Sequence, residues 1–310
     1  MTRSAFSMTA EELAGIFDQI PALSGRPREL RELSGGLTNR NFHVIAPGGE
    51  FVARCSDLSG NALGIDRDAE HFNTAAAAAA GVGAEAVAYR PDLGVLVVRF
   101  LQGRTLSRAS FAEPGVIGRV ATACRALHAG PRFQGEFDMF ERQRGYLATV
   151  QAGGFTVPDG YHDHDATIAE IRRALAVRDE GTVPCNNDLL AENFIDDGAK
   201  VWLIDYEYAG NNDACFELGN IWCECHLSLA QLEELVTAYY GRPRPSRLAR
   251  ARLLGVVGAW GWTLWGAIQH ATSPLDFDFW AWTMERYEIA VRELTGPDLP
   301  ALLHDVQQED

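Results

Sequence analysis

The sequence predicts an α+β protein in which a small antiparallel-sheet lobe precedes a larger, mainly helical lobe. Over roughly the first hundred residues, short apolar runs alternate with glycine and proline turns, which is the pattern of strands joined by hairpins. Beyond them apolar residues recur at helical spacing, and only the segment 181–210 looks strand-like. We therefore place the lobe boundary at a hinge near residues 101–104, which divides 1–102 from 103–310.

The first lobe is expected to open with a short helix and three strands. Residues 10–17 show helical spacing, and the stretch 27–44 has the pattern of two strands on either side of a glycine turn. A Pro-Gly-Gly hairpin turn then precedes a third strand at 51–55, with Arg54 near its end.

An alanine-rich helix and two further strands complete this lobe. Residues 66–80 form a strong helical pattern that ends in six alanines, with Gly81 as the stop signal. The alanines predict that this helix packs closely on the sheet. Strands are predicted at 84–89 and 94–100, joined by a Pro-Asp turn.

The second lobe is expected to consist of helices. Helical spacing covers 114–129 and 168–177, and it dominates from residue 216 onward apart from a Gly-Arg-Pro-Arg-Pro break at 241–245. The segment 253–275 carries no charged residue and is long enough to span a bilayer. Its several glycines, with a glutamine, a histidine and a proline, indicate a buried helix instead.

The composition is that of an ordinary globular protein with an acidic balance. Lys and Arg number 27 against 42 Asp and Glu, which gives a formal net charge of −15 over 310 residues. Nucleic-acid binding depends on basic side chains, so this balance argues against a nucleic-acid partner and is compatible with a cationic small substrate. The six cysteines form no C-x-x-C pair, and residues 1–20 show no signal segment, so we expect free thiols in a cytoplasmic protein without membrane attachment.

The loop from Asn187-Asp188 to Asn193, followed by Asp205, carries the most specific chemical signal. Phosphoryl transfer needs one carboxylate at the attacking hydroxyl, and a second carboxylate with an amide oxygen on Mg²⁺. Asp188 and Asn193 keep the spacing of the protein-kinase catalytic loop, in which the Asp is the base and the Asn holds metal. Asp and Asn are also ordinary turn residues, but an apolar run predicts a buried strand that presents Asp205 at its end. We therefore interpret Asp188 as the base and Asn193 and Asp205 as Mg²⁺ ligands.

Five motifs follow one another along the chain: Ser34-Gly35-Gly36-Leu37-Thr38-Asn39, the Asp188 loop, Leu203-Ile204-Asp205-Tyr206-Glu207-Tyr208-Ala209-Gly210, Phe216-Glu217-Leu218-Gly219-Asn220 with Glu224, and Trp262-Thr263-Leu264-Trp265. In this order they resemble the choline/ethanolamine kinase family, within the aminoglycoside-phosphotransferase-like branch of the protein-kinase-like fold. The resemblance extends over nearly the whole chain and implies an enzyme that uses ATP and Mg²⁺.

The resemblance also implies the residues that hold ATP. Backbone amides of the glycine-containing segment would cover the phosphates, through Ser34, Gly35, Gly36, Thr38 and Asn39. Arg54 would be the strand-borne cation on the phosphates, with Glu70 as its ion-pair partner, by analogy with the kinase Lys–Glu pair. The backbone of the linker Arg99-Phe100-Leu101 would hydrogen-bond adenine.

The chain departs from the family pattern at two positions. Asn186 stands two residues before Asp188, where the family usually has a histidine that bonds backbone around the metal-binding strand. An amide donates and accepts hydrogen bonds much as an imidazole does. We therefore expect the enzyme to keep its activity, with some reduction at most. Leu229 stands where the family often has an aromatic residue, which leaves the identity of the amine open.

The substrate side is expected to be aromatic and acidic. A quaternary ammonium has no N–H to donate, so its recognition rests on aromatic faces and nearby carboxylates. Trp262 and Trp265 share a helix face, Trp282 aligns with an aromatic of the family's pocket, and Trp260 and Trp280 are expected in the core. The substrate-binding residues implied by the resemblance are Glu207, Tyr208, Glu224, Trp262, Trp265 and Trp282.

The leading functional hypothesis is a kinase of a small amino alcohol, with choline or ethanolamine first. Two alternatives remain open at this stage: a kinase of another small alcohol, such as an aminoglycoside, thiamine or a sugar, and a nucleotide-binding pseudokinase. The tryptophans argue against the aminoglycoside, and the retained Asp188, Asn193 and Asp205 argue against the pseudokinase. The oligomeric state, including a homodimer, is left open.

Overall fold

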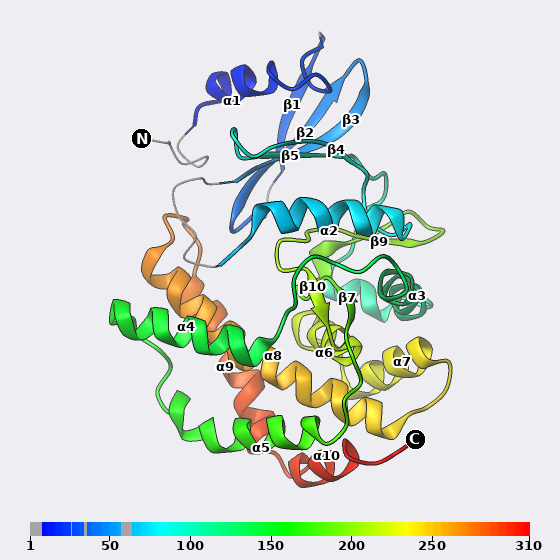
Figure 1. Ribbon diagram of the computed structural model, residues 1–310, viewed down its shortest axis with the longest axis vertical. Coiled ribbons are helices and arrows are strands. Elements are labelled where there is room, and N and C mark those ends of the chain that lie inside the picture. The colour runs from blue at the N-terminus through cyan, green and yellow to red at the C-terminus, as the bar shows by residue number, and fades with distance from the viewer. Residues whose placement is uncertain (1–7, 26, 34–35, 57–63) are drawn as a thin grey trace.

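Five antiparallel strands form the upper lobe of the computed structural model, and helices fill the lower lobe (Figure 1). The structure describes residues 8–25, 27–33, 36–56 and 64–310, so Ser34 and Gly35 lie outside the described residues. The strand order is β1-β2-β3-β5-β4, with β1 (Glu29–Leu33), β2 (Asn39–Ala46), β3 (Gly49–Ser56), β4 (Ala86–Arg90) and β5 (Val95–Arg99). The predicted α+β fold with an antiparallel sheet in the first lobe is confirmed.

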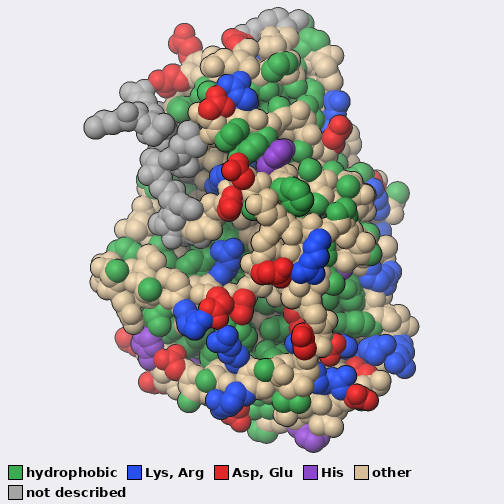
Figure 2. Space-filling model, viewed as in Figure 1, with side chains coloured by type: hydrophobic (Ala, Val, Ile, Leu, Met, Phe, Trp, Pro, Cys, Tyr) green, Lys and Arg blue, Asp and Glu red, His purple; other side chains and the backbone are tan. Residues whose placement is uncertain are grey.

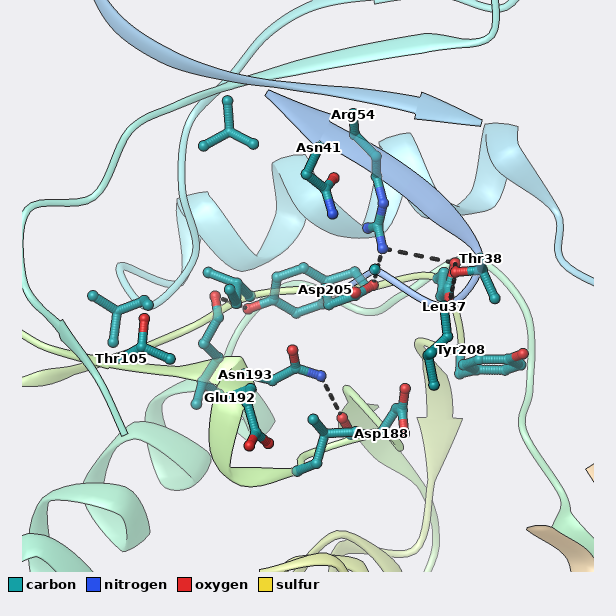
Figure 3. A pocket seen from close by; sticks show the side chains of 18 of the residues that line it. Leu37, Thr38, Asn41, Arg54, Thr105, Asp188, Glu192, Asn193, Asp205 and Tyr208 are labelled. Atoms are coloured by element: carbon teal, nitrogen blue, oxygen red, sulfur yellow. Dashed lines mark hydrogen bonds and ion pairs between the residues drawn. The ribbon is translucent and has the colours of Figure 1, made fainter. Parts of the chain in front are cut away.

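The sheet buries one face under the N-terminal helix α1 (Ala10–Phe17). Buried side chains alternate along β2, where Phe42 and Val44 point to the same face, and they meet Leu13 and Phe17 in one apolar cluster. The pairing of β2 with β3 sets Asn41 opposite Arg54. Because side chains alternate along a strand, this register directs the Arg54 side chain away from the α1 core and toward the second lobe (Figure 3).

The alanine-rich helix α2 (Arg67–Ala79) lies between the sheet and the second lobe (Figure 1). Asp66 caps its first turn by accepting hydrogen bonds from two backbone N–H groups. The helix contacts β4 of the sheet, as predicted, but its alanines Ala76 and Ala77 belong to the apolar core of the second lobe. The small side chains therefore serve the contact between the lobes.

The second lobe consists of eight described α-helices after α2, together with short 3₁₀ turns. The predicted helices are present, and the helix α4 is an addition that the sequence analysis did not anticipate. The helices are α3 (Val116–His128), α4 (Met139–Gly153), α5 (Asp165–Ala176), α6 (Ala214–Glu224), α7 (Leu229–Tyr240), α8 (Pro245–Thr272), α9 (Phe279–Leu294), with α10 (Leu299–Asp305) as a short final one; the 3₁₀ turns are η2 (Arg108–Ala112), η3 (Tyr161–His164) and η4 (Ala191–Asn193).

Short strands hold the loops that carry the polar motifs. β7 (Val183–Cys185) pairs with β10 (Gly210–Asn212), and β8 (Phe194–Asp196) pairs with β9 (Val201–Leu203). The strand-like region expected at 181–210 is therefore present, but it was not the only one, because β6 (Arg104–Thr105) joins the edge of β8. The apolar strand β9 ends two residues before Asp205, as the sequence predicted.

The long helix α8 is the buried centre of the second lobe. It crosses α6 at a point where two glycines meet, since a Cβ on Gly219 would lie 2.0 Å from the Ala251 carbonyl oxygen and one on Gly255 would lie 2.6 Å from the Gly219 carbonyl oxygen. The two backbones can approach this closely only without side chains. Within the described residues, no helix has the length and apolar character needed to cross a membrane.

Candidate active site

A cavity of about 980 Å³ opens between the two lobes and is lined by residues of both. It collects most of the predicted site residues from separate elements and loops of both lobes, among them Arg54, Asp188, Asp205, Glu224 and Trp262. On the face shown in Figure 2, acidic and basic side chains are interspersed, so the net charge of −15 is not gathered there into one patch.

The backbone of the Asp188 loop is fixed by helix α6. The buried Glu217 carboxylate accepts hydrogen bonds from the N–H groups of Asn186 (2.9 Å) and Asn187 (2.7 Å). One turn further along α6, the Asn220 side chain accepts from the N–H of Leu189 at 2.9 Å. Asn187 has a φ of 69°, and its side chain donates to backbone carbonyls on both sides of the loop. The loop is therefore held by buried side chains before any ligand binds.

Asn186 fills the position at which the family has histidine and makes the bonds expected of that residue. Its Nδ2 donates to the carbonyl oxygens of Ile204 (3.0 Å) and Asp205 (2.8 Å), and its Oδ1 accepts from the N–H of Asp188 (3.1 Å). The amide thus joins the loop that carries Asp188 to the strand end that carries Asp205.

The carboxylate of Asp188 faces the cavity, and no hydrogen bond to it is recorded within the described part of the chain (Figure 3). Burial, followed by the nearby carboxylates of Asp205 and Glu224, raises the pKa of Asp188 well above its ordinary value. A carboxylate with a raised pKa is a stronger proton acceptor, which suits the role of a general base.

Asp205 and Asn193 place two oxygen ligands on one side of the same cavity (Figure 3). Asp205 adopts a φ of 65° just after β9, and Asn193 is oriented because its Nδ2 donates to the Asp188 carbonyl at 2.8 Å, which leaves Oδ1 free of recorded partners in the described chain. Carboxylate and amide oxygens are the donors that Mg²⁺ prefers. The residues present therefore fit a magnesium ion.

The expected ion pair between Arg54 and Glu70 is present, with Nη1 and Oε1 2.8 Å apart. Arg54 also contacts Asp205, and its Nη2 lies 3.7 Å from Glu207. Although burial acts to lower it, the carboxylates of Asp205, Glu70 and Glu207 raise the pKa of Arg54. Sequence reasoning missed a second cation, Arg67, which lies 2.7 Å from Glu70 and opens α2.

Glu207 lines the cavity together with the other predicted substrate residues, and its carboxylate contacts the first lobe. It accepts hydrogen bonds from the Thr38 hydroxyl (2.8 and 2.9 Å) and from the Asn39 side chain (2.9 Å), and it lies 3.2 Å from Arg67. Burial and the neighbouring Asp205 carboxylate raise the pKa of Glu207. This carboxylate therefore links the two lobes at the cavity wall.

The linker at 99–101 also lines the cavity. Two of its N–H groups are already used, because Arg99 donates to the Glu85 carbonyl (2.9 Å) and Phe100 donates to the Glu50 carbonyl (3.0 Å). The N–H of Leu101 has no recorded acceptor among the described residues. Within this linker, the backbone N–H of Leu101 is therefore the donor left to hydrogen-bond an adenine ring.

The aromatic end of the cavity is formed by α8 and α9. Trp262 packs edge-on against Tyr208 with ring centroids 5.1 Å apart, and Trp265 Nε1 donates to the Tyr208 hydroxyl at 2.8 Å. Trp282 lies 5.0 Å from Trp265, and all four rings line the cavity. Trp260 is in the core as predicted, stacked on another ring at 3.8 Å.

Three further residues were expected, or are found, near the aromatic end of the cavity. The expectation that Trp280 is a core residue is wrong, because it is only half-buried and lies beside His270. Leu229 begins α7, is 45% exposed and does not line the cavity. Sequence reasoning also missed Arg286, one helical turn after Trp282, whose guanidinium lies 3.8 Å from the centre of that ring. The Trp-x-x-x-Arg spacing on α9 was the available signal.

A buried group behind the loop, His128, Cys185 and Glu217, has ligand atoms within 4.8 Å of one another. Hydrogen bonding accounts for it: His128 Nδ1 pairs with the Tyr239 hydroxyl at 2.7 Å, and its Nε2 lies 3.6 Å from both Cys185 and Glu217. All six cysteines are buried and free, as expected from the sequence.

Comparisons with known proteins agree with this geometry. A family model described as choline/ethanolamine kinase matches residues 30–236. Protein LicA of Haemophilus influenzae is 30% identical over 212 residues, which cover 66% of this chain and 61% of LicA, so the match spans less than two thirds of that relative. A choline/ethanolamine kinase family protein from Mesorhizobium loti is 33% identical, with a TM-score of 0.86 over 97% of this chain and 99% of its own. Choline kinase LicA of Streptococcus pneumoniae shares the fold, with a TM-score of 0.75 and 21% identity over 92% of this chain and 99% of its own.

Proposed function

The chain belongs to the choline/ethanolamine kinase family, whose members are small-molecule kinases, and we propose that it phosphorylates the hydroxyl of a small amino alcohol, choline or ethanolamine, with ATP as phosphoryl donor and Mg²⁺ as cofactor. The observation that carries the proposal is the position of Asp188. One cavity contains this proton acceptor, the oxygen ligands Asp205 and Asn193, and the aromatic wall of α8. A small alcohol between the two ends would meet all three.

At the phosphate end, the proposal assigns charge neutralisation to the first lobe. Arg54, held by Glu70, would contact the phosphates of ATP, with the backbone of residues 36–39 covering them. Asn193 and Asp205 would hold Mg²⁺, which when bound neutralises charge on the phosphates. Because Arg54 contacts Asp205 in the structure, that contact must loosen for Asp205 to serve as a ligand.

At the other end, the proposal assigns substrate orientation to the second lobe. Ring faces of Trp262, Trp265 and Trp282 would attract the ammonium group, and Asp188 would accept the proton of the substrate hydroxyl. The alcohol oxygen would form its bond to the γ-phosphorus as the bond to the leaving ADP breaks, and the proton would end on the Asp188 carboxylate.

The test is ADP release measured with Mg²⁺ and ATP against choline, ethanolamine, thiamine and an aminoglycoside, with ³¹P NMR to identify the product. We expect choline or ethanolamine to support turnover and to yield a phosphomonoester. The Asp188→Asn variant is the matched control, because it keeps the shape of the side chain and removes the proton acceptor. Turnover with thiamine or the aminoglycoside alone, or with no alcohol at all, would overturn the assignment.

A further inference from the structure

The amine end of the cavity already contains a buried cation of the protein itself. Arg286, on α9, is 4% exposed. Its guanidinium lies 3.8 Å from the centre of the Trp282 ring, and its Nη2 lies 2.5 Å from Oε2 of Glu224. Nη1 pairs with Glu285 at 2.5 Å. The arginine therefore binds two of the residues that were expected to receive the ammonium of the substrate, Glu224 and Trp282.

This pairing limits the hydrogen-bond acceptors that remain. Among the described cavity-lining residues of α6, α8 and α9, Glu224 is the one carboxylate, and one of its two oxygens is taken by Arg286. The indole N–H of Trp265 is a donor and already binds Tyr208, and the buried Trp262 N–H is also a donor. On these three helices, the cavity walls that remain present aromatic faces and one carboxylate oxygen.

The number of acceptors discriminates between kinds of ammonium. A primary ammonium has three N–H donors, and each donor that is desolvated without an acceptor costs free energy. A quaternary ammonium has no N–H group, so it loses no hydrogen bond in an aromatic enclosure and gains attraction to the ring faces. The amine end therefore suits methylated nitrogen better than a primary amine.

Resting on the proposed function, we infer that this enzyme selects a quaternary ammonium alcohol over a primary one, and that Arg286 is the residue that sets this selectivity by holding Glu224 and one face of Trp282. Arg286 acts through these two residues, so it is a positioning residue. Its effect is expected on the amine and on the ratio between amines, while the affinity for ATP stays the same.

The test is kcat/KM for ethanolamine and its mono-, di- and trimethylated forms, the last being choline. We expect the wild type to rise along the series by about tenfold or more between the two ends, since one unmade charged hydrogen bond is a loss of this order. The neutral isostere 3,3-dimethylbutan-1-ol should be a poorer substrate than choline, because it keeps the shape and lacks the charge. A flat or falling series in the wild type would overturn the inference.

Arg286→Gln should lower the ratio of choline to ethanolamine by about tenfold, because it returns an oxygen of Glu224 to N–H donors. Arg286→Lys, which keeps the charge but loses the planar fork, should lower it less. Arg250→Gln is the matched control: Arg250 is also a buried arginine, on α8, paired with Asp213 at 2.5 Å, and it does not line this cavity. It should leave the ratio unchanged.

The outcomes distinguish a failure of the proposed function from a failure of the role assigned to Arg286. If the wild type phosphorylates none of the four amines, the proposed function fails. If it phosphorylates them and the Arg286 variants keep the wild-type ratio while only their melting temperatures fall, Arg286 is structural and this inference alone fails. If neither Arg286 variant folds, the wild-type series decides the selectivity on its own.

Discussion

The two ends of the cavity are built in different ways. At the phosphate end, side chains from both lobes meet through ion pairs, with Arg54 of β3 reaching Asp205 and Glu207 in the second lobe. At the amine end, Trp262 and Trp265 come from one buried helix, and α6 and α9 of the same lobe supply the rest. One end spans a boundary between lobes, and the other end lies within a single packed core.

This difference indicates where each binding function can be perturbed. An ion-pair end assembled across lobes depends on how the lobes meet, and motion between lobes is the usual expectation where their interface is polar. An aromatic end inside one core is preformed, because close-packed interiors hold side chains in place. Changes at the phosphate end should therefore affect the nucleotide and turnover, and changes in helix packing should affect the amine.

The largest expected effect is that of Asp205→Ala. Loss of the carboxylate removes the proposed magnesium ligand, and we expect turnover to fall by roughly a thousandfold or more. The measurement is ADP release, with circular dichroism to verify the fold. If the ends are independent, binding of choline measured by calorimetry should survive, and a folded Asp205→Ala protein with near-normal turnover would refute the assignment.

Gly255→Ala should destabilise the second lobe by adding a single methyl group. Its Cβ would meet the backbone of Gly219, so the α6–α8 crossing must widen, at a cost of about 1–3 kcal/mol. We expect a lower melting temperature and a higher KM for the amine than for ATP, because α8 carries both tryptophans. Gly258→Ala is the control on the same helix: its Cβ would meet only the Phe216 ring, at 3.6 Å, and it should be neutral or stabilising.

Trp262→Ala and Trp265→Ala should each raise the KM for the amine. The rise should be up to about thirtyfold if a desolvated cation–π contact of about 2 kcal/mol is lost. Trp262→Phe is the cleaner probe, because the Trp262 N–H has no recorded partner while that of Trp265 binds Tyr208. Trp262→Phe should keep part of the affinity for the amine that Trp262→Ala loses. Early melting together with normal amine kinetics would instead make these residues part of the core alone.

The smallest expected effect is on stability. The folded-state pKa of Asp188 is raised, so the folded protein loses stability as pH rises from the unfolded value of about 3.9 through that raised pKa, by about 1.4 kcal/mol for each unit of difference. Asp188→Asn removes this loss. Without metal and nucleotide, its melting temperature should exceed that of the wild type near pH 8, and the gap should close toward pH 4.

Asp196 provides the control of opposite sign. Burial acts to raise its pKa, but the hydrogen bond from Arg119 and the N–H of Gly198 outweigh this and lower it. A lowered folded-state pKa gives stability that is present above the unfolded value and lost as pH falls through the folded one. Asp196→Asn should therefore destabilise the protein at neutral pH, with a penalty that shrinks in acid. A pH-independent gap for both variants would contradict the electrostatic explanation.

Local patterns predicted the phosphate end well. The strand before Asp205, the Arg54–Glu70 pair and the bonding role of Asn186 follow from residue types and short spacings, which are visible in the sequence. The bonding of Glu207 to Thr38 was not predictable, because these residues are 169 positions apart and only the meeting of the lobes brings them together.

Some contacts depend on tertiary packing and could not be predicted from the sequence. The alanines of α2 predict close packing against something, but only the fold shows that this is the core of the second lobe. On α6, Glu217, Asn220 and Glu224 lie on one helix face and are all buried, so their spacing was a readable sign of a polar face turned inward. That Glu217 and Asn220 fix the Asp188 loop depended on the position of β7 and could be seen only in three dimensions.

The amide at position 186 has a consequence for how the enzyme responds to acid. An imidazole in this place would gain a proton between pH 5 and 8 and lose its acceptor as it did so. Asn186 keeps its donors on Ile204 and Asp205 and its acceptor for Asp188 throughout that range, because an amide does not titrate there. The hydrogen bonds that join the Asp188 loop to the end of β9 are thus insensitive to protons, and the acid limb of the activity profile should report the carboxylates of the cavity alone.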